Sequence, residues 1–563
     1  MKKTFLKKLL SSLIFNGLGF FTLLFFSPLE VYIGNPSDFR IFVDSAVIIL
    51  ALTALALTVV LSFILSFLPV KILKIINLSI FSTTVCFYVQ SLFLNGSMNI
   101  LTGESLTVSK FVTFINIAVW ILIICLVFAF WFLFKKSRKE KVFISTTKYI
   151  ALALVIMQLT GFLSMYINYD KSINESKTLY CSTDGQFELS KNKNVLYFIV
   201  DNCDTAIVNE ALEQDPNMFA YFNGFTCYTD NVFTHSRSFP AITYLLSGEK
   251  CYYNLPYNEY VDNALKNSKF LNTIDKLGTD IRVYTDPRLI GAASKEIIDN
   301  SKTISSFKLS DINMLGFLKQ SLKVSGFRGL PYFAKSRFFY DTETVNSKSL
   351  VSRKDAAPIN NDPMFYTSIL SEQISTNNKY TSALRFYHMF GSHPGAVINE
   401  NGEYQIDVTL PQALRGNLKI IQAYLEKLKA TDAYDNTTII ITADHGEFQG
   451  ELSRPQTCLL LVKEAGADTS LPIDFSDAPV CQEDLFPTVL KALGANYSDF
   501  GTPLSEISEN ETRTRYHYNT EIDFSNGYET TLREYTINGT ASNLENYEAT
   551  GKEWKVKSSL SPH

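Results

Sequence analysis

The residues best suited to chemistry form an Asp-His-Gly triplet at positions 444–446, directly after the apolar β-branched run 439–441. Such a run is typical of a buried strand, and open α/β sheets bind ligands at the carboxyl ends of their strands. Asp444 offers a hard oxygen and His445 a borderline nitrogen, which is the ligand mixture of zinc- or manganese-type sites. Gly446 lets the backbone turn tightly beside an ion. Taken alone, however, such a triplet is more often an ordinary polar turn.

Three other polar residues have a similar placement at the ends of predicted elements. Asp201 follows the apolar run 195–200, and His393 lies just beyond the strand-like run 383–389. Ser238 stands two residues before a proline, where a helix is expected to begin. Its hydroxyl would lie where helix amides favour an oxyanion or a phosphate, although a serine there is also a common plain N-cap. Considered jointly, these positions favour a site over unrelated caps and turns.

This combination of residues suits a metal-assisted phosphoryl transfer. Asp201, Asp444 and His445 would hold a divalent ion. The ion would bind the Ser238 oxygen and lower the pKa of its hydroxyl, so that Ser238 attacks phosphorus. His393 would bind a phosphate oxygen or handle the proton of the leaving group.

The elements that must position these residues begin near residue 195. Strand-like and helical runs alternate from there, at residues 195–200, 205–214, 270–277, 281–285, 383–389, 410–428, 439–441, 458–462 and 483–493. This alternation predicts an α/β domain with a largely parallel central sheet flanked by helices. Residues 301–361 are less regular and are interpreted as an insertion. The tail alternates polar with aromatic residues, which predicts a small C-terminal antiparallel sheet.

The first third of the chain predicts an α-helical transmembrane domain. Five apolar segments are long enough, or nearly so, to cross about 30 Å of hydrocarbon as helices, at residues 9–26, 41–68, 72–94, 111–134 and 149–167. Basic residues gather in alternate loops: four lysines before the first segment, then Lys71 and Lys74, then KKSRKEK at 135–141. The other loops hold Arg40 and Lys110. This pattern predicts a cytoplasmic N-terminus and an extracytoplasmic position for everything after about residue 169.

The expected organisation is therefore a five-helix transmembrane domain at 1–168, a polar linker at 169–194, a catalytic domain at 195–510 and a C-terminal β subdomain at 511–563. The net charge of −4, without a basic stripe that carries interleaved aromatics, argues against a nucleic-acid partner. The cysteines outside the apolar segments permit disulfides in an oxidising compartment and leave their pairing open.

Several motifs, taken together and in this order, resemble those of the alkaline phosphatase/sulfatase superfamily. With five preceding spans, the chain is similar to lipoteichoic acid synthases and lipid A phosphoethanolamine transferases. The matching segments are the first metal strand NVLYFIVD at 194–201, the nucleophile segment SFPAITYLLSG at 238–248, GSHPG with its substrate-binding histidine at 391–395, the second metal motif ITADHGE at 441–447, and the helix EDLFPTVLKALG at 483–494.

Departures from the family patterns separate its branches. Ile242 stands where sulfatases carry the arginine that directs conversion of the nucleophile to formylglycine, and Asn202 stands where they carry a second carboxylate. Sulfate ester hydrolysis is therefore disfavoured. The membrane transferases usually carry threonine as nucleophile, so Ser238 is a departure, and two neighbouring hydroxyls remain alternatives, Ser236 and Thr234. Additional ligands for a second zinc are not recognisable, so one divalent ion (manganese, zinc or magnesium) is expected.

The resemblance implies a multi-pass protein of the bacterial cell membrane that transfers a phospho-head group, phosphoglycerol or phosphoethanolamine. The donor would be a membrane phospholipid, and the acceptor a cell-envelope glycan or lipid-linked polymer. Ser238 would carry the covalent intermediate, and His393 would bind substrate. The alternatives are a membrane-anchored phosphodiesterase or sulfatase-type hydrolase, and a non-catalytic binding descendant of the fold. Arg337, with the aromatics at 338–340, is a candidate glycan or head-group contact, or equally part of a packed surface helix.

Overall fold

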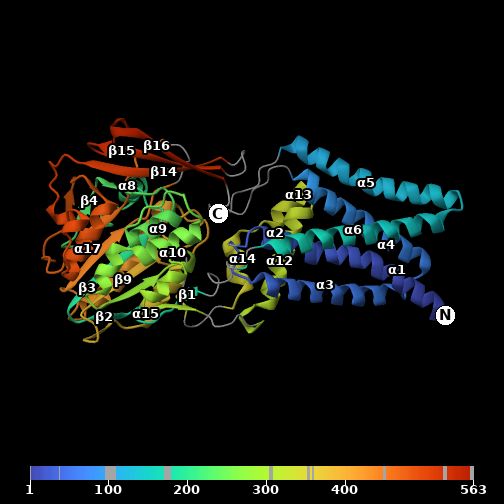
Figure 1. Ribbon diagram of the computed structural model, residues 1–563, viewed down its shortest axis with the longest axis horizontal. Helices are drawn as coiled ribbons and strands as arrows, with labels where there is room; N and C mark the ends of the chain where they lie inside the picture. Colours follow the sequence, from blue (N-terminus) through green and yellow to red (C-terminus); the bar gives the residue numbers. More distant parts are fainter. Residues whose placement is uncertain are drawn as a thin grey trace. The chain divides into compact units, whose positions relative to one another are not determined.

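The chain forms two compact units in the computed structural model, which describes residues 2–36, 38–95, 109–169, 171, 179–303, 309–351, 356–357, 361–447, 452–523 and 529–557 (Figure 1). The first unit holds residues 1–177 and 306–352, and the second holds residues 178–305 and 353–562. This division differs from the predicted domains. Residues 306–352 pack with the apolar helices and not inside a continuous catalytic domain, and two short strands of the predicted linker, β1 (Leu179–Cys181) and β2 (Glu188–Ser190), belong to the second unit.

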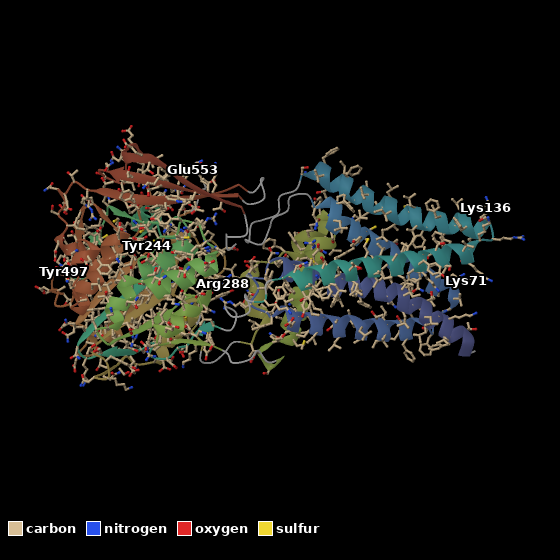
Figure 2. The ribbon with its side chains drawn as sticks, viewed as in Figure 1. Lys71, Lys136, Tyr244, Arg288, Tyr497 and Glu553 are labelled. Carbon is tan, nitrogen blue, oxygen red and sulfur yellow. The ribbon has the colours of Figure 1, made fainter. Side chains whose placement is uncertain are left out.

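The first unit contains five helices that are long and apolar enough to cross a membrane. They are built from α1 (Lys2–Phe20), η1 (Phe21–Phe26) and α2 (Ser27–Gly34), then α3 (Val43–Leu65), α4 (Val70–Val89) with η2 (Gln90–Leu94), α5 (Lys110–Lys136) and α6 (Glu140–Asn168). Lys71 and Lys136 lie at the same end of these helices (Figure 2). Two contacts tie this end together: the Lys8 amine donates to the Leu68 carbonyl at 2.8 Å, and Lys74 pairs with Glu140 at 2.9 Å.

Residues 309–351 add a helical insertion to the first unit. Its elements are η5 (Leu309–Asp311), α12 (Met314–Gly329), α13 (Tyr332–Lys335), η6 (Ser336–Phe338) and α14 (Thr342–Ser349). Phe317 and Val324 of α12 are fully buried in one apolar cluster with Tyr32 of α2 and with Phe39, which lies between α2 and α3. The insertion therefore shares a core with the membrane helices.

A seven-stranded sheet forms the centre of the second unit. Its strands follow the order β12 (Asp474–Ser476), β4 (Thr226–Tyr228), β11 (Leu460–Lys463), β10 (Thr437–Thr442), β3 (Lys193–Val200), β9 (Ser382–Met389) and β6 (Thr279–Tyr284). The four strands β10, β3, β9 and β6 are parallel, whereas β11 is antiparallel to both of its neighbours. Central strands such as β3 are buried on both faces, which explains their continuous apolar runs. The predicted α/β class is confirmed.

Helices pack against this sheet in two groups. One group contains α8 (Thr205–Gln214), α15 (Asp362–Ser371) and α16 (Leu410–Lys429); the other contains α9 (Ser238–Ser247), α10 (Tyr257–Asn267), α11 (Lys269–Asp275) and α17 (Leu485–Leu493). Both α16 and α17 contact β3. The start of α16 follows from its sequence, because Thr409 and Gln412 form a reciprocal capping box and Pro411 lies in the first turn.

The C-terminal residues form the expected antiparallel sheet of three strands, β14 (Thr514–Asp523), β15 (Glu529–Asn538) and β16 (Tyr547–Lys557). Strand β14 reaches the loop before α9. The Tyr518 amide donates to the Thr234 carbonyl at 2.8 Å, and the Thr520 amide donates to Ser236 Oγ at 2.9 Å. The small sheet therefore holds the loop that leads into Ser238.

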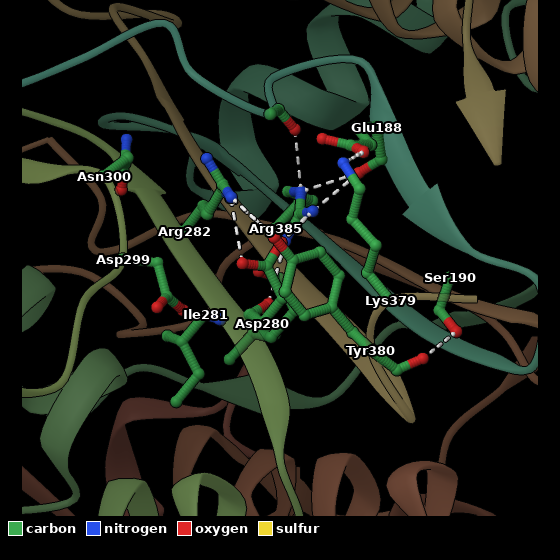
Figure 3. Close-up of polar contacts among 12 residues, drawn as sticks. Glu188, Ser190, Asp280, Ile281, Arg282, Asp299, Asn300, Lys379, Tyr380 and Arg385 are labelled. Atoms are coloured by element: carbon green, nitrogen blue, oxygen red, sulfur yellow. Dashed lines mark hydrogen bonds and ion pairs between the residues drawn. The ribbon is translucent and has the colours of Figure 1, made fainter. Parts of the chain in front are cut away.

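A buried ion pair joins β9 to the edge strand β6 (Figure 3). The Arg385 guanidinium is fully buried and lies 2.5 Å from an Asp280 carboxylate oxygen. It also donates to the carbonyls of Gly185 and Glu188, at 2.9 and 2.6 Å. One side chain thus connects two strands with the segment that precedes the sheet. Because each guanidinium nitrogen has acceptors, this is a satisfied structural network.

We expect Arg385→Met to destabilise the second unit by about 3–5 kcal/mol, because it breaks a buried pair and leaves carbonyls without donors. The midpoint of thermal unfolding should fall by roughly 10 °C. Lys379→Met is the matched control: Lys379 pairs with Glu188 in the same network at 3.2 Å, but its side chain is 68% exposed, so the change should cost under about 1 kcal/mol. Equal melting temperatures for the two variants would contradict this role of Arg385.

Candidate metal centre and nucleophile

The register of the parallel strands brings the two predicted carboxylates together. Ile199 of β3 pairs with Thr442 of β10, so Asp201 and Asp444 each follow two residues after a paired position. Both side chains therefore emerge at the same carboxyl edge of the sheet, as the sequence predicted. A potential metal-binding group is present there, in which ligand atoms of Asp201, Asp444 and His445 all lie within 4.8 Å of one another, and all three residues are buried.

Ser238 completes this group. Its Oγ lies 2.9 Å from His445 Nε2 and 3.3 and 3.4 Å from the two carboxylate oxygens of Asp201. His445 Nε2 lies 3.6 Å from Asp201 and 3.5 Å from Asp444. The structure thus brings together the four residues that the sequence assigned to the ion and the nucleophile. A hydroxyl beside a carboxylate and an imidazole is an arrangement suited to nucleophilic attack.

The plain capping alternative for Ser238 is wrong. Helix α9 begins at Ser238 itself, and Arg237 occupies the N-cap position without a capping side-chain hydrogen bond. Of the two alternatives, Ser236 Oγ accepts the Thr520 amide, as described above, and the Thr234 backbone is held by hydrogen bonds to Gln482 Oε1 and to the Tyr518 amide, both at 2.8 Å. Ser238 is therefore the hydroxyl that faces Asp201 and His445.

Backbone contacts fix the orientation of His445. Its Nδ1 donates to the Gly446 carbonyl at 2.6 Å, which leaves the lone pair of Nε2 directed at the site. Gly446 has no room for a side chain, because a Cβ there would lie 2.6 Å from Cβ of Asp204. Asp204 is held in turn, since it caps α8 through the Ile207 amide at 3.0 Å and pairs with Arg454 at 2.9 Å. The imidazole is therefore oriented before any ligand binds.

The surroundings of Asp444 fit a metal ion. One carboxylate oxygen accepts the amides of Asn202 and His445 at 3.1 and 2.9 Å. The other, Oδ2, is buried and accepts no hydrogen bond from any residue that the structure describes. Burial and the neighbouring charge of Asp201 both raise the pKa of Asp444. A buried carboxylate oxygen without a donor, next to a second carboxylate, is stabilised when a cation binds, so these residues fit a divalent ion.

His388 is a site residue that sequence reasoning missed. It lies on β9, where its Nε2 is 3.3 Å from Asp201 Oδ2 and its Nδ1 is 2.8 Å from the Thr285 hydroxyl. Burial opposes ionisation of Asp201, yet the His388 hydrogen bond and the charges of His393 and His445 lower the pKa of Asp201 to about 2. Its position in the sequence could have indicated this role, because His388 is the last polar residue of a strand expected in the same sheet.

We expect His388→Ala to weaken metal binding by roughly 10–100-fold, since a group that orients a ligand carboxylate is lost. His388→Gln keeps an amide donor that can reach Asp201 and should recover part of that affinity. Titration calorimetry with Mn²⁺ or Zn²⁺ on the full chain in detergent measures both variants. Alanine and glutamine variants that bind the ion as tightly as the parent would exclude this orienting role.

His393 lies on a loop that is clamped to Asp201. The Ser392 amide donates to the Asp201 carbonyl at 2.9 Å, and a Cβ at Gly391 would lie 2.3 Å from the Asp201 amide nitrogen, so a glycine is required. His393 itself is half-buried, and its Nδ1 donates to the Pro394 carbonyl at 2.9 Å. Nε2 is therefore the ring nitrogen that can face a substrate, as an acceptor when unprotonated and as a donor when protonated. Arg337, the other predicted substrate contact, is exposed on η6 of the first unit and is not among the residues gathered here.

A second residue that the sequence did not single out is Arg288, labelled in Figure 2. Its guanidinium lies 5.4 Å from the ring centre of Phe239, the residue after the nucleophile. It pairs with Asp286 at 2.9 Å, and its side chain keeps 23% of its surface exposed. The pair directly follows β6, as the other site residues follow their strands. Arg288 is thus a partly exposed cation beside the N-terminus of α9.

Comparisons with known proteins were made for sequence and for structure. No protein-family model and no curated protein match the sequence. Among solved structures, a Vibrio parahaemolyticus protein of the alkaline phosphatase superfamily shares 13% identity at a TM-score of 0.35, with 70% of this chain and 88% of that chain covered. A phosphonate monoester hydrolase from Silicibacter pomeroyi shares 16% identity at a TM-score of 0.38, covering 63% and 88%.

A 2-O GAG sulfatase shares 11% identity at a TM-score of 0.33, with 65% of this chain and 84% of that chain covered. These likenesses concern the fold alone. The chemistry of the site depends on the positions of Asp201, Ser238, Asp444 and His445 in this chain. In its fold, the chain is similar to alkaline phosphatase superfamily proteins and sulfatases.

Proposed function

We propose that this protein is a membrane-bound phosphotransferase. It moves a phospho-head group, phosphoglycerol or phosphoethanolamine, from a membrane phospholipid to a hydroxyl of a cell-envelope glycan or lipid-linked polymer. One observation carries the proposal: a serine hydroxyl lies 2.9 Å from His445 within a buried group of two carboxylates, on a chain with five helices able to cross a membrane. A hydrolase of soluble esters would gain little from those helices.

Asp201, Asp444 and His445 would hold one divalent ion, with the Ser238 oxygen as a further ligand. Such an ion, when bound, lowers the pKa of a ligated hydroxyl and offsets negative charge on phosphoryl oxygens. Ser238 Oγ attacks phosphorus and forms an Oγ–P bond, and the bond between phosphorus and the diacylglycerol oxygen breaks. Asp201 is the acceptor within reach of the Ser238 proton, because its carboxylate oxygens lie 3.3 and 3.4 Å from Ser238 Oγ. His393 supplies a proton to the leaving oxygen.

The second half of the reaction reverses these roles. The hydroxyl oxygen of the acceptor attacks the phosphorus on Ser238, the Oγ–P bond breaks, and Ser238 regains a proton. His393 accepts the proton of the incoming hydroxyl, because the group that acts as acid in the first step acts as base in the second. The head group thus leaves the enzyme attached to the acceptor, and no high-energy cofactor is consumed.

Arg288 and His393 are suited to hold the anionic phosphodiester in place. Arg288 lies over Phe239, next to the nucleophile, and its fork of donors matches phosphate oxygens. His393 is half-buried on a loop bonded to Asp201. Arg288→Ala should raise the KM for phospholipid while leaving the metal in place, whereas His393→Ala should also lower kcat because it removes the proton donor.

The test uses the purified full chain in proteoliposomes with labelled phosphatidylglycerol or phosphatidylethanolamine and Mn²⁺. The expected products are diacylglycerol and a peptide that carries the head-group phosphate on Ser238. Added polyol should divert label from water to the polyol without slowing diacylglycerol release. Failure to form diacylglycerol from any phospholipid would overturn the proposal. Label that passes only to water at every polyol concentration would establish a phosphodiesterase instead, and sulfate release from an aryl sulfate would establish a sulfatase.

A further inference from the structure

The helical insertion, residues 309–351, has contacts that fix its depth along the membrane helices. Arg328 at the end of α12 pairs with Glu30 of α2 at 2.7 Å, and the Arg328 carbonyl accepts from Asn95 Nδ2 at 2.8 Å. The Tyr332 amide at the start of α13 donates to Asn116 Oδ1 of α5 at 3.1 Å. Three separate membrane helices therefore hold the same short stretch of the insertion.

Those three contacts lie at one level. About 20 residues of helix cross 30 Å of hydrocarbon. The count starts from the basic residue at the lysine end of each helix, namely Lys8, Lys74 and Lys135. It ends at Pro28, Leu94 and Ile115 respectively. The contact residues Glu30, Asn95 and Asn116 stand within two positions of these ends. The insertion is thus docked where hydrocarbon gives way to head groups, at the end opposite the lysines.

Large apolar side chains of the insertion are left uncovered. Leu315 of α12 is 79% exposed and Phe333 of α13 is 64% exposed. The exposed face of α12 continues one turn at a time from Leu315 through Lys319 to Leu322, so it alternates apolar and basic residues. A helix with this kind of face typically lies in a membrane interface, with its apolar groups toward the acyl chains and its lysine at the phosphates.

The apolar surface of the insertion is continuous with that of the spans. Phe333 directly follows Tyr332, which is bonded to Asn116, and Phe114 beside that asparagine is 70% exposed. Phe93, two residues before Asn95, is 75% exposed. A lipid layer that covers the exposed phenylalanines of the spans would meet the exposed phenylalanine of α13 without a break.

From this placement we infer that residues 309–351 form an interfacial element, embedded in the lipid head-group layer of the leaflet opposite the lysine end. Leu315 and Phe333 enter the upper acyl region, and Lys319 binds lipid phosphate. The inference does not depend on the catalytic activity proposed above. It also gives the insertion a role other than the acceptor contact expected from the sequence.

Spin labels test this placement in the full chain reconstituted in liposomes of phosphatidylethanolamine and phosphatidylglycerol. Cys125 is the exposed cysteine and the other seven are buried, so Cys125→Ser provides the background. Labels are attached to Leu315→Cys and Phe333→Cys. The matched control is Leu471→Cys, which is 57% exposed in the second unit. Collision rates of each label with oxygen, which concentrates in lipid, and with a water-soluble nickel chelate report its depth.

Labels at 315 and 333 should collide more with oxygen than with the nickel chelate, and the label at 471 should show the reverse. Because the two substituted side chains are exposed, the variants should fold as the parent does. A nickel preference at both 315 and 333 would place the insertion in water and overturn the inference. Weak collision with both reagents at these positions would show that protein covers them, and would overturn it as well.

Discussion

Ser238→Ala should lower head-group release by roughly 10⁴-fold or more, because the variant lacks the oxygen that forms the covalent intermediate. In the structure this oxygen lies 2.9 Å from His445 and 3.3 Å from Asp201, so no other group of the site replaces it. Diacylglycerol formation in proteoliposomes measures the loss. The phosphorylated peptide at position 238 should disappear in the same samples.

Ser236→Ala is the matched control for this variant. Ser236 lies two residues away and its hydroxyl accepts the Thr520 amide, so its loss affects the link to β14 and not the chemistry. We expect it to keep activity within about tenfold, with a cost near 1 kcal/mol in stability. Mn²⁺ affinity should stay within a few fold in Ser236→Ala and should fall further in Ser238→Ala, which loses an oxygen ligand. If Ser236→Ala were inactive and Ser238→Ala active, the nucleophile would be reassigned.

Asp444→Asn should have the second large effect. It should weaken metal binding and activity in the metal-loaded protein, but it should stabilise the metal-free protein. In the metal-loaded protein the variant loses a charged ligand, so affinity for Mn²⁺ or Zn²⁺ should fall at least about 100-fold and activity with it. In the metal-free parent, Oδ2 of Asp444 accepts no hydrogen bond from the described residues, and the Asp444 charge is buried next to Asp201. The substitution removes that charge. The metal-free variant should therefore be more stable than the parent, by on the order of 1–3 kcal/mol.

Thermal unfolding, measured once with a chelator and once with added ion, tests both expected changes in stability. The melting temperature of Asp444→Asn should exceed that of the parent in chelator and respond less to the ion. Asp484→Asn is the contrasting control, because Asp484 is also buried but pairs with Arg513 at 2.7 Å. That variant should be less stable than the parent under both conditions. A destabilised Asp444→Asn in chelator would mean that its carboxylate has a structural role without metal.

The site residues that could be predicted are those that follow a recognisable run of residues in the sequence. A buried strand that ends in a carboxylate identified Asp201 and Asp444, and parallel neighbours necessarily present such residues at one edge. His388 was missed because its role comes from register. Pairing of Ile199 with His388 in β9 places the imidazole beside Asp201, and that alignment is a property of the sheet and not of either strand alone.

The insertion shows a second kind of limit to local pattern. The sequence indicated only a less regular insertion at 301–361, and the partners of its helices lie far away in the chain. Phe317 and Val324 share their core with Tyr32, and Ser325 Oγ donates to the Leu23 carbonyl at 2.5 Å. Such contacts join residues about three hundred positions apart, so composition near residue 320 carries no sign of them. The second unit is therefore not one continuous stretch of chain, because residues 309–351 belong to the first unit.

Because the insertion interrupts the second unit, the chain joins the two units at three places. A single cut after the last apolar helix would break the direct link to the spans, but the second unit would stay joined through both ends of the insertion to a segment that packs among those helices. A soluble fragment that begins at residue 178 would carry the insertion without its partner helices, so Phe317 and Val324 would lose the apolar core that they share with Tyr32.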